Sequence, residues 1–405
     1  MRADQPTTVA FTLPDLDIGG GQTILLRTLV ALREVQSELV PVVVALRDGP
    51  MLGRYEEAGI PCHVLGLPHG KASLSGHPAT VASMVRILGR ERVQAICSLN
   101  TPLDRAYAQL AGEIRRVPVA VWFMSVAIPL LGFPPPRGRE LAWAKRLALY
   151  PWNWCSIRRT AARLALSASV TASFADHLRL AGADFDLVPP GLPDAFYRSA
   201  LGPEQAATLR RSLGVQGRRP LLLCVGMLID LKGQQELVPM MGLLRQRLPE
   251  AHLLLVGEGP NRAMLEQLVE AEGVADRVTL LGHRGDVADL LAVSDGLISA
   301  SRSEGFGMAV LEAMAAGKPV VAVHTPAFEE FAVGGETAIF VERQDAALLA
   351  GTVADVFAEP ERAAAMGRTG RERAERFRVE RTAERLAAVL QRMLEERRAS
   401  ALATR

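Results

Sequence analysis

Two glutamates, Glu304 and Glu312, lie eight residues apart around a glycine turn in the stretch SEGFGMAVLEAM. Gly305 and Gly307 permit a sharp backbone turn, and the apolar spacing after them predicts a helix that begins near Gly307. Unpaired N–H groups at the start of a helix bind anions, and a carboxylate accepts hydrogen bonds from sugar hydroxyls. The stretch therefore favours a nucleotide-sugar site, with the hexose at Glu304, the diphosphate at the helix start and the ribose at Glu312.

The predicted anion site would use the backbone N–H groups at the start of the helix, which are those of Phe306, Gly307, Met308 and Ala309. A simpler interpretation fits the same spacing. In it, Glu304 caps the helix and Glu312 is a solvated residue on the outer face of the helix. The spacing alone favours neither interpretation.

These residues need a scaffold, and the chain of 405 residues is long enough for two domains. Short apolar stretches alternate with helical patterns from TVAFTL to VPVAVWF, and the alternation restarts at LLLCVG. Continuous apolar strands in this order predict buried parallel sheets. A Pro/Gly-rich stretch at 188–198 separates the halves. We therefore predict an α/β fold of two doubly wound domains, 1–190 and 191–380, with a final helix at about 380–405 packing back on the first.

Several further motifs occur in order along the second half. They are CVGMLIDLKG, LLLVGEGPNRAML and VTLLGHRGDVADLLAVSDGLISASRSEGFG. Together with SEGFGMAVLEAMAAGKPVV, they resemble the retaining glycosyltransferases of family four (glycosyl transferases group 1). The resemblance implies the GT-B fold, in which two Rossmann-like domains face each other across a cleft. In the first half, DIGGGQ resembles the glycine-rich G-G-x-E loop of that family.

The resemblance implies a role for each matching position. Lys232 would bind the diphosphate, and Glu304 would orient and stabilise the reacting sugar, so these two are the expected catalytic residues. Lys318, in a helix-to-strand turn, is expected to be only a solvated residue. The expected donor-binding residues are Gly19, Gly20, Gly226, Met227, Lys232, His283, Arg284, Glu304, Gly305, Phe306, Gly307, Met308, Ala309 and Glu312.

The chain departs from the family pattern at four places. Met227 stands where the family has a diphosphate-binding arginine, and Met124 aligns with a histidine that usually approaches the donor sugar. Pro326 and Ala327 replace a glycine pair, which predicts a stiffer loop. Gln22 replaces the glutamate of the glycine-rich loop.

The resemblance implies a retaining hexosyltransferase. It would move a sugar from a nucleotide-diphosphate donor, with UDP expected before GDP, to a hydroxyl acceptor on a glycan, a lipid-linked intermediate or a small metabolite. It would need no metal ion and no cofactor beyond the donor. The departures leave two alternatives open: a nucleotide-sugar-binding protein of this fold with little turnover, and, with weaker motif support, a UDP-sugar epimerase.

A segment at 137–163 has seven basic residues, one acidic residue and three of the four tryptophans, Trp143, Trp152 and Trp154. Such a segment suits an anionic membrane surface, but it also fits a helix with core-packed indoles and solvated arginines. The net charge of +2 gives no sign of a nucleic-acid partner. Neither a signal-peptide pattern nor a sufficiently long apolar run is visible. We therefore expect a cytoplasmic protein, and the composition of the segment leaves peripheral contact at the inner face of the membrane open beside the slightly favoured core-packed interpretation.

Overall fold

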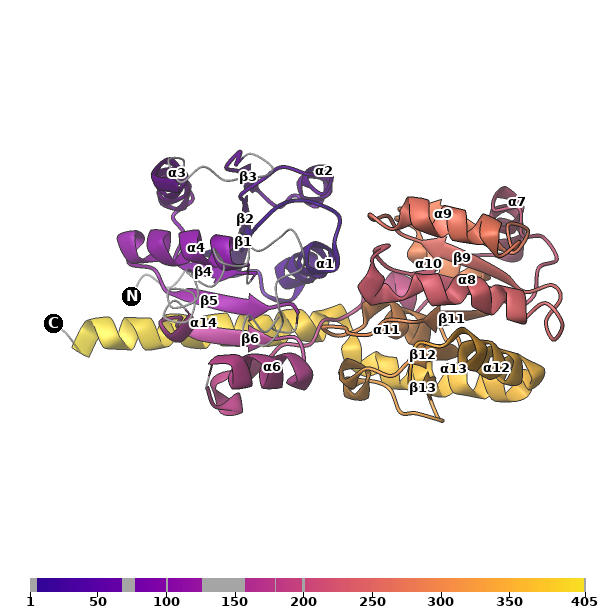
Figure 1. The fold of residues 1–405 in the computed structure, drawn as a ribbon. Coiled ribbons are helices and arrows are strands. Elements are labelled where there is room, and N and C mark those ends of the chain that lie inside the picture. Colours follow the sequence, from indigo (N-terminus) through magenta and orange to yellow (C-terminus); the bar gives the residue numbers. More distant parts are fainter. Residues whose placement is uncertain are drawn as a thin grey trace. The chain divides into compact units, whose positions relative to one another are not determined.

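The computed structural model describes residues 6–67, 77–99, 101–125, 157–178, 180–198 and 201–403. The chain forms two compact units (Figure 1). The first contains Met1–Gly191 and Val379–Arg405, and the second contains Leu192–Arg378. Each unit is built on one parallel sheet with helices. The predicted α/β class with two Rossmann-like units is therefore confirmed.

The first unit has a seven-stranded sheet in the order β3-β2-β1-β4-β5-β6-β7. The last helix, α14, returns to this unit and packs along α1. The strands are β1 Thr7–Leu13, β2 Leu39–Ala45, β3 Cys62–Val64, β4 Ala95–Ser98, β5 Val119–Phe123, β6 Ala162–Ala165 and β7 Asp186–Leu187. The α-helices are α1 Gly20–Val35, α2 Leu52–Glu57, α3 His77–Arg90, α4 Pro102–Arg115, α6 Ala168–Leu178 and α14 Val379–Ala403, and Gly182–Asp184 forms the 3-10 helix η2.

The second unit has a six-stranded sheet in the order β10-β9-β8-β11-β12-β13. The strands are β8 Leu221–Val225, β9 His252–Val256, β10 Val278–Gly282, β11 Gly296–Ser299, β12 Val320–Val323 and β13 Ile339–Val341. The α-helices are α7 Pro203–Ser212, α8 Gln234–Leu243, α9 Arg262–Ala271, α10 Val287–Val293, α11 Met308–Ala315, α12 Ala346–Ala358 and α13 Pro360–Ala374. The 3-10 helices are η3 Asp194–Phe196, η4 Asp230–Lys232, η5 Pro326–Glu330 and η6 Glu375–Phe377.

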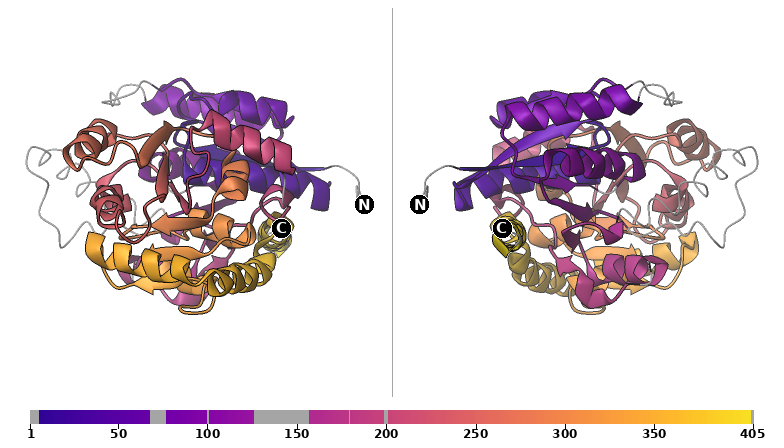
Figure 2. Two further views of the ribbon diagram at one scale, coloured as in Figure 1. Left: turned by 90° about the vertical axis from the view of Figure 1, so that its right-hand side faces the viewer. Right: turned by 90° about the vertical axis from the view of Figure 1, so that its left-hand side faces the viewer.

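The central strands of the second sheet are mostly apolar because helices cover both of their faces. All five residues of β9, HLLLV, are buried. Leu222 of β8 and Leu253 of β9 belong to a core that also contains Leu237 of α8 and Leu349 of α12. Helices α12 and α13 lie next to each other near β13 (Figures 1 and 2).

In each sheet, two neighbouring strands are not consecutive in the chain. In the second unit these are β8 and β11, which pair at Leu223 and Leu297. The connection from β8 runs toward β9 on one side, while the connection from β11 runs toward β12 on the other. Ligands of open α/β sheets bind at such a switch point, outside the carboxyl ends of the strands. The fold therefore predicts a ligand site after Val225 and Ser299.

The first sheet has the same switch point between β1 and β4, where Asp104 of α4 is fully buried. The Ser98 hydroxyl donates to Asp104 Oδ2 at 2.7 Å, and Oδ1 has no hydrogen-bond partner in the described part of the chain. Burial raises the pKa of this carboxyl from 3.8 to about 6, and the hydrogen bond from Ser98 opposes part of that rise.

We expect Asp104→Asn to remove a pH-dependent loss of stability. The pKa of the Asp104 carboxyl is higher in the folded chain than in the unfolded chain. The contribution of this carboxyl to stability is therefore complete below pH 3.8 and is lost as the pH rises through about 6. Between pH 5 and pH 8, the free energy of unfolding of the natural chain should fall by about 1.4 kcal/mol relative to the variant. Urea unfolding of both proteins measures this difference, and a pH-independent difference would contradict the raised pKa.

None of the helices in the described residues is long and apolar enough to cross a membrane.

Candidate active site

Lys232 and Glu304 meet at the β8–β11 switch point of the second unit. Lys232 ends η4, which follows β8, and Glu304 lies in the loop between β11 and α11. The ammonium Nζ of Lys232 donates to Glu304 Oε1 at 2.6 Å and to Oε2 at 2.7 Å. The two side chains are 24% and 16% exposed, so the pair is partly shielded but open to a ligand. The two predicted catalytic residues, 72 positions apart, therefore lie in direct contact.

Glu304 is not a helix cap. The N-cap of α11 is Gly307, and no side chain makes a capping hydrogen bond there. Glu312 is only 6% exposed, although it lies in the middle of a short helix. The simpler interpretation, in which Glu304 caps the helix and Glu312 is solvated, is therefore wrong at both residues.

The loop after β8 approaches the end of β11 because Gly233 has a φ of +68°. A Cβ at this position would overlap with the carbonyl oxygen of Ala300, the residue that follows β11. The amide of Arg302 donates to the carbonyl of Leu231 at 2.9 Å. The glycine after Lys232 thus fixes the two loops against each other, and this contact holds the lysine beside Glu304.

The Gly226–Met227 turn carries no cation of its own. The Met227 side chain is 48% exposed, and its carbonyl accepts a hydrogen bond from Nε2 of Gln234 at 3.0 Å. The stem of Lys232 packs at the Cα of Gly226, where an added Cβ would lie 3.7 Å from Lys232 Cδ. The buried amide of Gln234 therefore fixes this turn. Gln234 is not among the residues predicted from the sequence, although its place directly after the Lys-Gly pair could have indicated it.

Helix α11 starts at a glycine whose backbone conformation other residues rarely adopt. Gly307 has a φ of +100°, and an added Cβ would overlap with the ring of Phe328. The adjacent Phe306 is 2% exposed, and its ring stacks on Phe331 with 5.1 Å between centroids. The Phe306 side chain therefore supports the loop from within the core, and only its backbone could meet a ligand. Met308 and Ala309, next in the first turn, are partly exposed.

The loop after β10 lies two strands from β8 in the sheet. His283 is exposed there. The guanidinium of Arg284 binds Asp286 through Nε at 2.8 Å and Nη2 at 2.5 Å, which raises the pKa of the arginine. The structure places the predicted base-binding residues at the same sheet edge as Lys232, but not in contact with it.

Gly19 and Gly20 belong to the first unit, at the start of α1. Gly19 is the N-cap of the helix, and Gly20 is its first residue. An added Cβ at Gly21 would lie 3.8 Å from the Cβ of Met124, so the methionine lies beside the glycine loop. Gln22 donates to Asp15 Oδ1 at 2.8 Å. The carboxyl edge of this sheet therefore gathers Asp15 and Gln22 together with Met124.

Two predictions about loops can be compared with the structure. Lys318 is not simply solvated, because its Nζ donates to the carbonyls of Ala292 at 3.1 Å and Ser294 at 2.8 Å. Burial lowers the pKa of Lys318. The lysine closes the end of α10, and the prediction of a solvated turn residue is wrong.

Pro326 and Ala327 begin the 3-10 helix η5, in which Ala327 is buried.

Within the residues that the structure describes, no group of three or more His, Cys, Asp or Glu side chains is arranged to hold a metal ion. Positions 137–156 of the basic segment, with Trp143, Trp152 and Trp154, lie outside the described residues. At the end of this segment, Arg158 and Arg159 are exposed.

Sequence comparison identifies relatives of this chain. A sequence profile of the family "Glycosyl transferases group 1" matches residues 205–373. The GDP-mannose-dependent alpha-(1-6)-phosphatidylinositol monomannoside mannosyltransferase of Mycolicibacterium smegmatis is 32% identical over 277 residues, which are 62% of this chain and 70% of that protein. The D-inositol 3-phosphate glycosyltransferase of Segniliparus rotundus is 31% identical over 209 residues, 50% of this chain and 46% of that protein.

Solved structures share the fold over almost the whole chain. Anabaena Alr3699/HepE, in complex with UDP-glucose, superposes with a TM-score of 0.79 at 22% sequence identity and covers 95% of this chain and 99% of its own. WaaG, a glycosyltransferase involved in lipopolysaccharide biosynthesis, superposes with a TM-score of 0.71 at 20% identity, over 94% of this chain and 99% of its own.

The two parallel-sheet units have the GT-B fold that these solved structures share. The chain belongs to the glycosyl transferases group 1 family. It is an enzyme that uses a nucleotide-sugar donor and an acceptor, so the predicted family, fold and enzyme class are confirmed. These findings favour transfer over the two alternatives, a binder without turnover and an epimerase.

Proposed function

We propose that the chain transfers a hexose-type sugar from a UDP- or GDP-sugar to a hydroxyl acceptor, with retention of anomeric configuration and without a metal ion. The contact of Lys232 with both oxygens of Glu304 at the switch point carries this proposal. The names of two similar proteins support the donors, since one is GDP-mannose-dependent and the other was crystallised with UDP-glucose.

The diphosphate of the donor would compete with Glu304 for the ammonium of Lys232. Once released from the lysine, Glu304 could accept hydrogen bonds from the hexose hydroxyls. As the bond between the anomeric carbon and the diphosphate oxygen breaks, its electron pair goes to that oxygen. Lys232 and the first N–H groups of α11 stabilise the negative charge that develops there. The acceptor oxygen then bonds to the anomeric carbon on the same face, and its proton passes to the diphosphate.

With the diphosphate at Lys232 and at the start of α11, the remaining donor contacts can be proposed. Buried Glu312 would hold the two ribose hydroxyls, and the backbone at His283 and Arg284 would meet the base. Gly19 and Gly20 of the glycine-rich loop are also proposed to contact the donor. That unit, comprising 1–190 and the last helix, would bind the acceptor with its carboxyl edge, where Asp15 and Gln22 lie. The donor sugar is the only co-substrate in this proposal, and no separate cofactor takes part.

The proposal is tested by a thermal-shift screen of UDP-, GDP- and dTDP-sugars. A ligand at 100 times its dissociation constant stabilises the native state by about 2.7 kcal/mol, which is easily measured as a rise in melting temperature. We expect one nucleotide class to raise it clearly above the others. If no member of the panel changes the melting temperature, the proposed donor site is wrong.

The metal-independent step has its own test. Because Lys232 and the amides of α11 supply the positive charge, transfer should continue within about twofold of its initial rate in excess EDTA. The measurement is release of nucleoside diphosphate with and without the chelator. Complete loss in EDTA that magnesium or manganese restores would show that a metal ion supplies this charge instead.

We also propose that the chain works at the cytoplasmic face of an anionic membrane, which segment 137–163 contacts. The basic, tryptophan-rich composition of the segment supports this, as does the lipid named in the Mycolicibacterium relative. Each arginine near such a surface contributes about 1 kcal/mol to the free energy of membrane binding. This attraction should weaken in salt, because the distance over which charges interact falls to about 3 Å in about 1 M salt.

We therefore expect co-sedimentation with phosphatidylglycerol vesicles but not with phosphatidylcholine vesicles. Salt should weaken it, as should Arg158→Glu combined with Arg159→Glu, which changes two exposed side chains. Tryptophan emission should shift to the blue with anionic vesicles. Emission that is already blue in the free protein and that vesicles leave unchanged would instead support the core-packed interpretation.

A further inference from the structure

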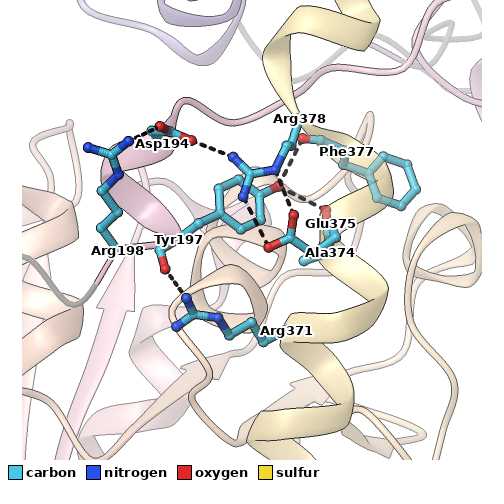
Figure 3. A network of polar contacts seen from close by, with 8 residues as sticks. All are labelled: Asp194, Tyr197, Arg198, Arg371, Ala374, Glu375, Phe377 and Arg378. Atoms are coloured by element: carbon cyan, nitrogen blue, oxygen red, sulfur yellow. Dashed lines mark hydrogen bonds and ion pairs between the residues drawn. The ribbon is translucent and has the colours of Figure 1, made fainter.

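The chain passes between the two units twice, at residues 191–192 and 378–379, and the two passages are joined to each other. The amide of Leu192 donates to the carbonyl of Phe377 at 2.8 Å, and Leu192 forms an isolated parallel bridge with Arg378. The hydroxyl of Tyr197 donates to the same Phe377 carbonyl at 3.1 Å and to that of Ala374 at 2.8 Å (Figure 3). We call Leu192–Arg198 and Ala374–Arg378 together the crossover.

Charged side chains hold the crossover in this arrangement. The guanidinium of Arg378 lies over the ring of Tyr197, 4.2 Å from its centroid. Its Nε donates to Glu375 at 2.6 Å, and its Nη1 donates to Asp194 (Figure 3). From the neighbouring turn of α13, Arg371 donates to the carbonyl of Tyr197. Tyr197 is 2% exposed, so these contacts surround a buried ring.

The ring of Phe377 connects this network to the active-site loop. It meets the ring of Phe306 edge-on, with 5.7 Å between centroids, and that of Phe331 at 6.1 Å. Phe306 lies two positions after Glu304 and directly before Gly307, the N-cap of α11. Phe377 therefore contacts the donor loop through its ring, while its carbonyl holds both Leu192 and Tyr197.

We propose that Phe377 is a positioning residue, which couples occupancy of the Glu304 loop to the crossover. The inference rests on the proposed function, because it requires a nucleoside diphosphate to bind at residues 304–312. A bound diphosphate restrains the N–H groups beside Phe306. Close-packed rings transmit such a restraint because they cannot shift independently. The restraint therefore reaches the Phe377 carbonyl and the two hydrogen bonds that it accepts.

Hydrogen–deuterium exchange of the full chain, with and without saturating UDP or GDP, tests this coupling. In the natural chain, the bound nucleotide should slow exchange at least threefold in peptides that cover 304–312 and in those that cover the crossover. In Phe377→Leu, protection of 304–312 should remain, whereas protection of the crossover should be lost. The nucleotide dissociation constant should change less than threefold, while kcat for transfer falls about tenfold at an unchanged donor KM.

Two further variants keep the result interpretable. Tyr197→Phe removes only the hydroxyl, which donates to the carbonyls of Phe377 and Ala374, and keeps the ring in place. It should also uncouple the crossover. Phe340→Leu alters a ring of the same aromatic cluster that stacks on Phe328 at 5.8 Å. This control should retain the nucleotide-dependent protection of the crossover.

The outcomes separate the two proposals. If neither UDP nor GDP protects residues 304–312, the proposed donor site is wrong and the coupling fails with it. If the nucleotide protects 304–312 but never the crossover, or protects the crossover equally in the natural chain, Phe377→Leu and Tyr197→Phe, the donor site stands and the coupling alone is overturned.

Discussion

Lys232→Met should lower the rate of sugar transfer by about 10²–10³-fold, because it removes a positioned cation from the oxygen where negative charge develops. The methionine keeps most of the apolar stem that packs at Gly226, so the loop after β8 should keep its conformation. Lys232→Arg should lose less activity than Lys232→Met, since it retains the charge. The measurement is kcat/KM for the donor identified by the thermal-shift screen.

Lys318→Met is the matched control, because Lys318 lies before β12, at the edge of the sheet opposite the carboxyl ends of the strands. It should lower stability because the carbonyls of Ala292 and Ser294 lose their donor. Transfer per folded molecule should change less than about threefold. Equal losses in Lys232→Met and Lys318→Met would mean that the loss at Lys232 reflects folding and not charge at the diphosphate.

The two glutamates should affect different steps. Glu312→Ala should weaken binding of the free nucleotide by about 1–3 kcal/mol, or roughly 5- to 150-fold, since paired ribose hydroxyls lose their acceptor. Glu304→Ala should not weaken nucleotide binding, because it removes the carboxylate that competes with the diphosphate for Lys232. It should reduce transfer, because Glu304 meets the hexose in the proposed site. Calorimetric titration with UDP and GDP measures the affinities.

Glu312 is buried, so Glu312→Gln is needed beside Glu312→Ala to separate lost hydrogen bonds from a cavity. The glutamine keeps the volume but changes the acceptor, and it should weaken nucleotide binding as well. Equal loss of nucleotide affinity at positions 304 and 312 would contradict the assignment of hexose to one and ribose to the other.

The local part of this site could be predicted from the sequence. The glycines around Phe306 and the apolar spacing after them placed the start of α11 near Gly307, where the structure has it. The alternation of strand and helix placed Glu304 after a strand at the carboxyl edge of a parallel sheet. Both inferences depend on contacts within about ten residues, which periodicity and turn chemistry determine directly.

The long-range part could not be predicted in this way. The contact between Lys232 and Glu304 depends on β8 and β11 being neighbours, which sequence order does not show. Phe306 looked like one more donor-loop residue, but packing against Phe331 and Phe377 puts its ring in the core. Lys318 was assigned to solvent because a turn lysine usually is solvated, whereas two carbonyls at the end of α10 hold it.

The substitution at Met227 remains the clearest difference from the family pattern at this site. The methionine is half exposed and brings no charge, and Gln234 fixes the turn through the Met227 carbonyl. In the proposed site, Lys232 is therefore the cation that the loop after β8 would offer to the diphosphate. Because the described part of this loop offers no other, we expect a large effect at Lys232.

The most direct test of sugar transfer at the Lys232–Glu304 site measures release of nucleoside diphosphate from UDP-glucose and from GDP-mannose. The full chain and Lys232→Met are assayed in parallel, without acceptor and in EDTA. We expect slow release from one of the two donors, and loss of that release in the variant while folding is retained. Failure of the natural chain to release nucleotide from a donor that it binds, or equal release by Lys232→Met, would contradict the claim that the Lys232–Glu304 site performs sugar transfer.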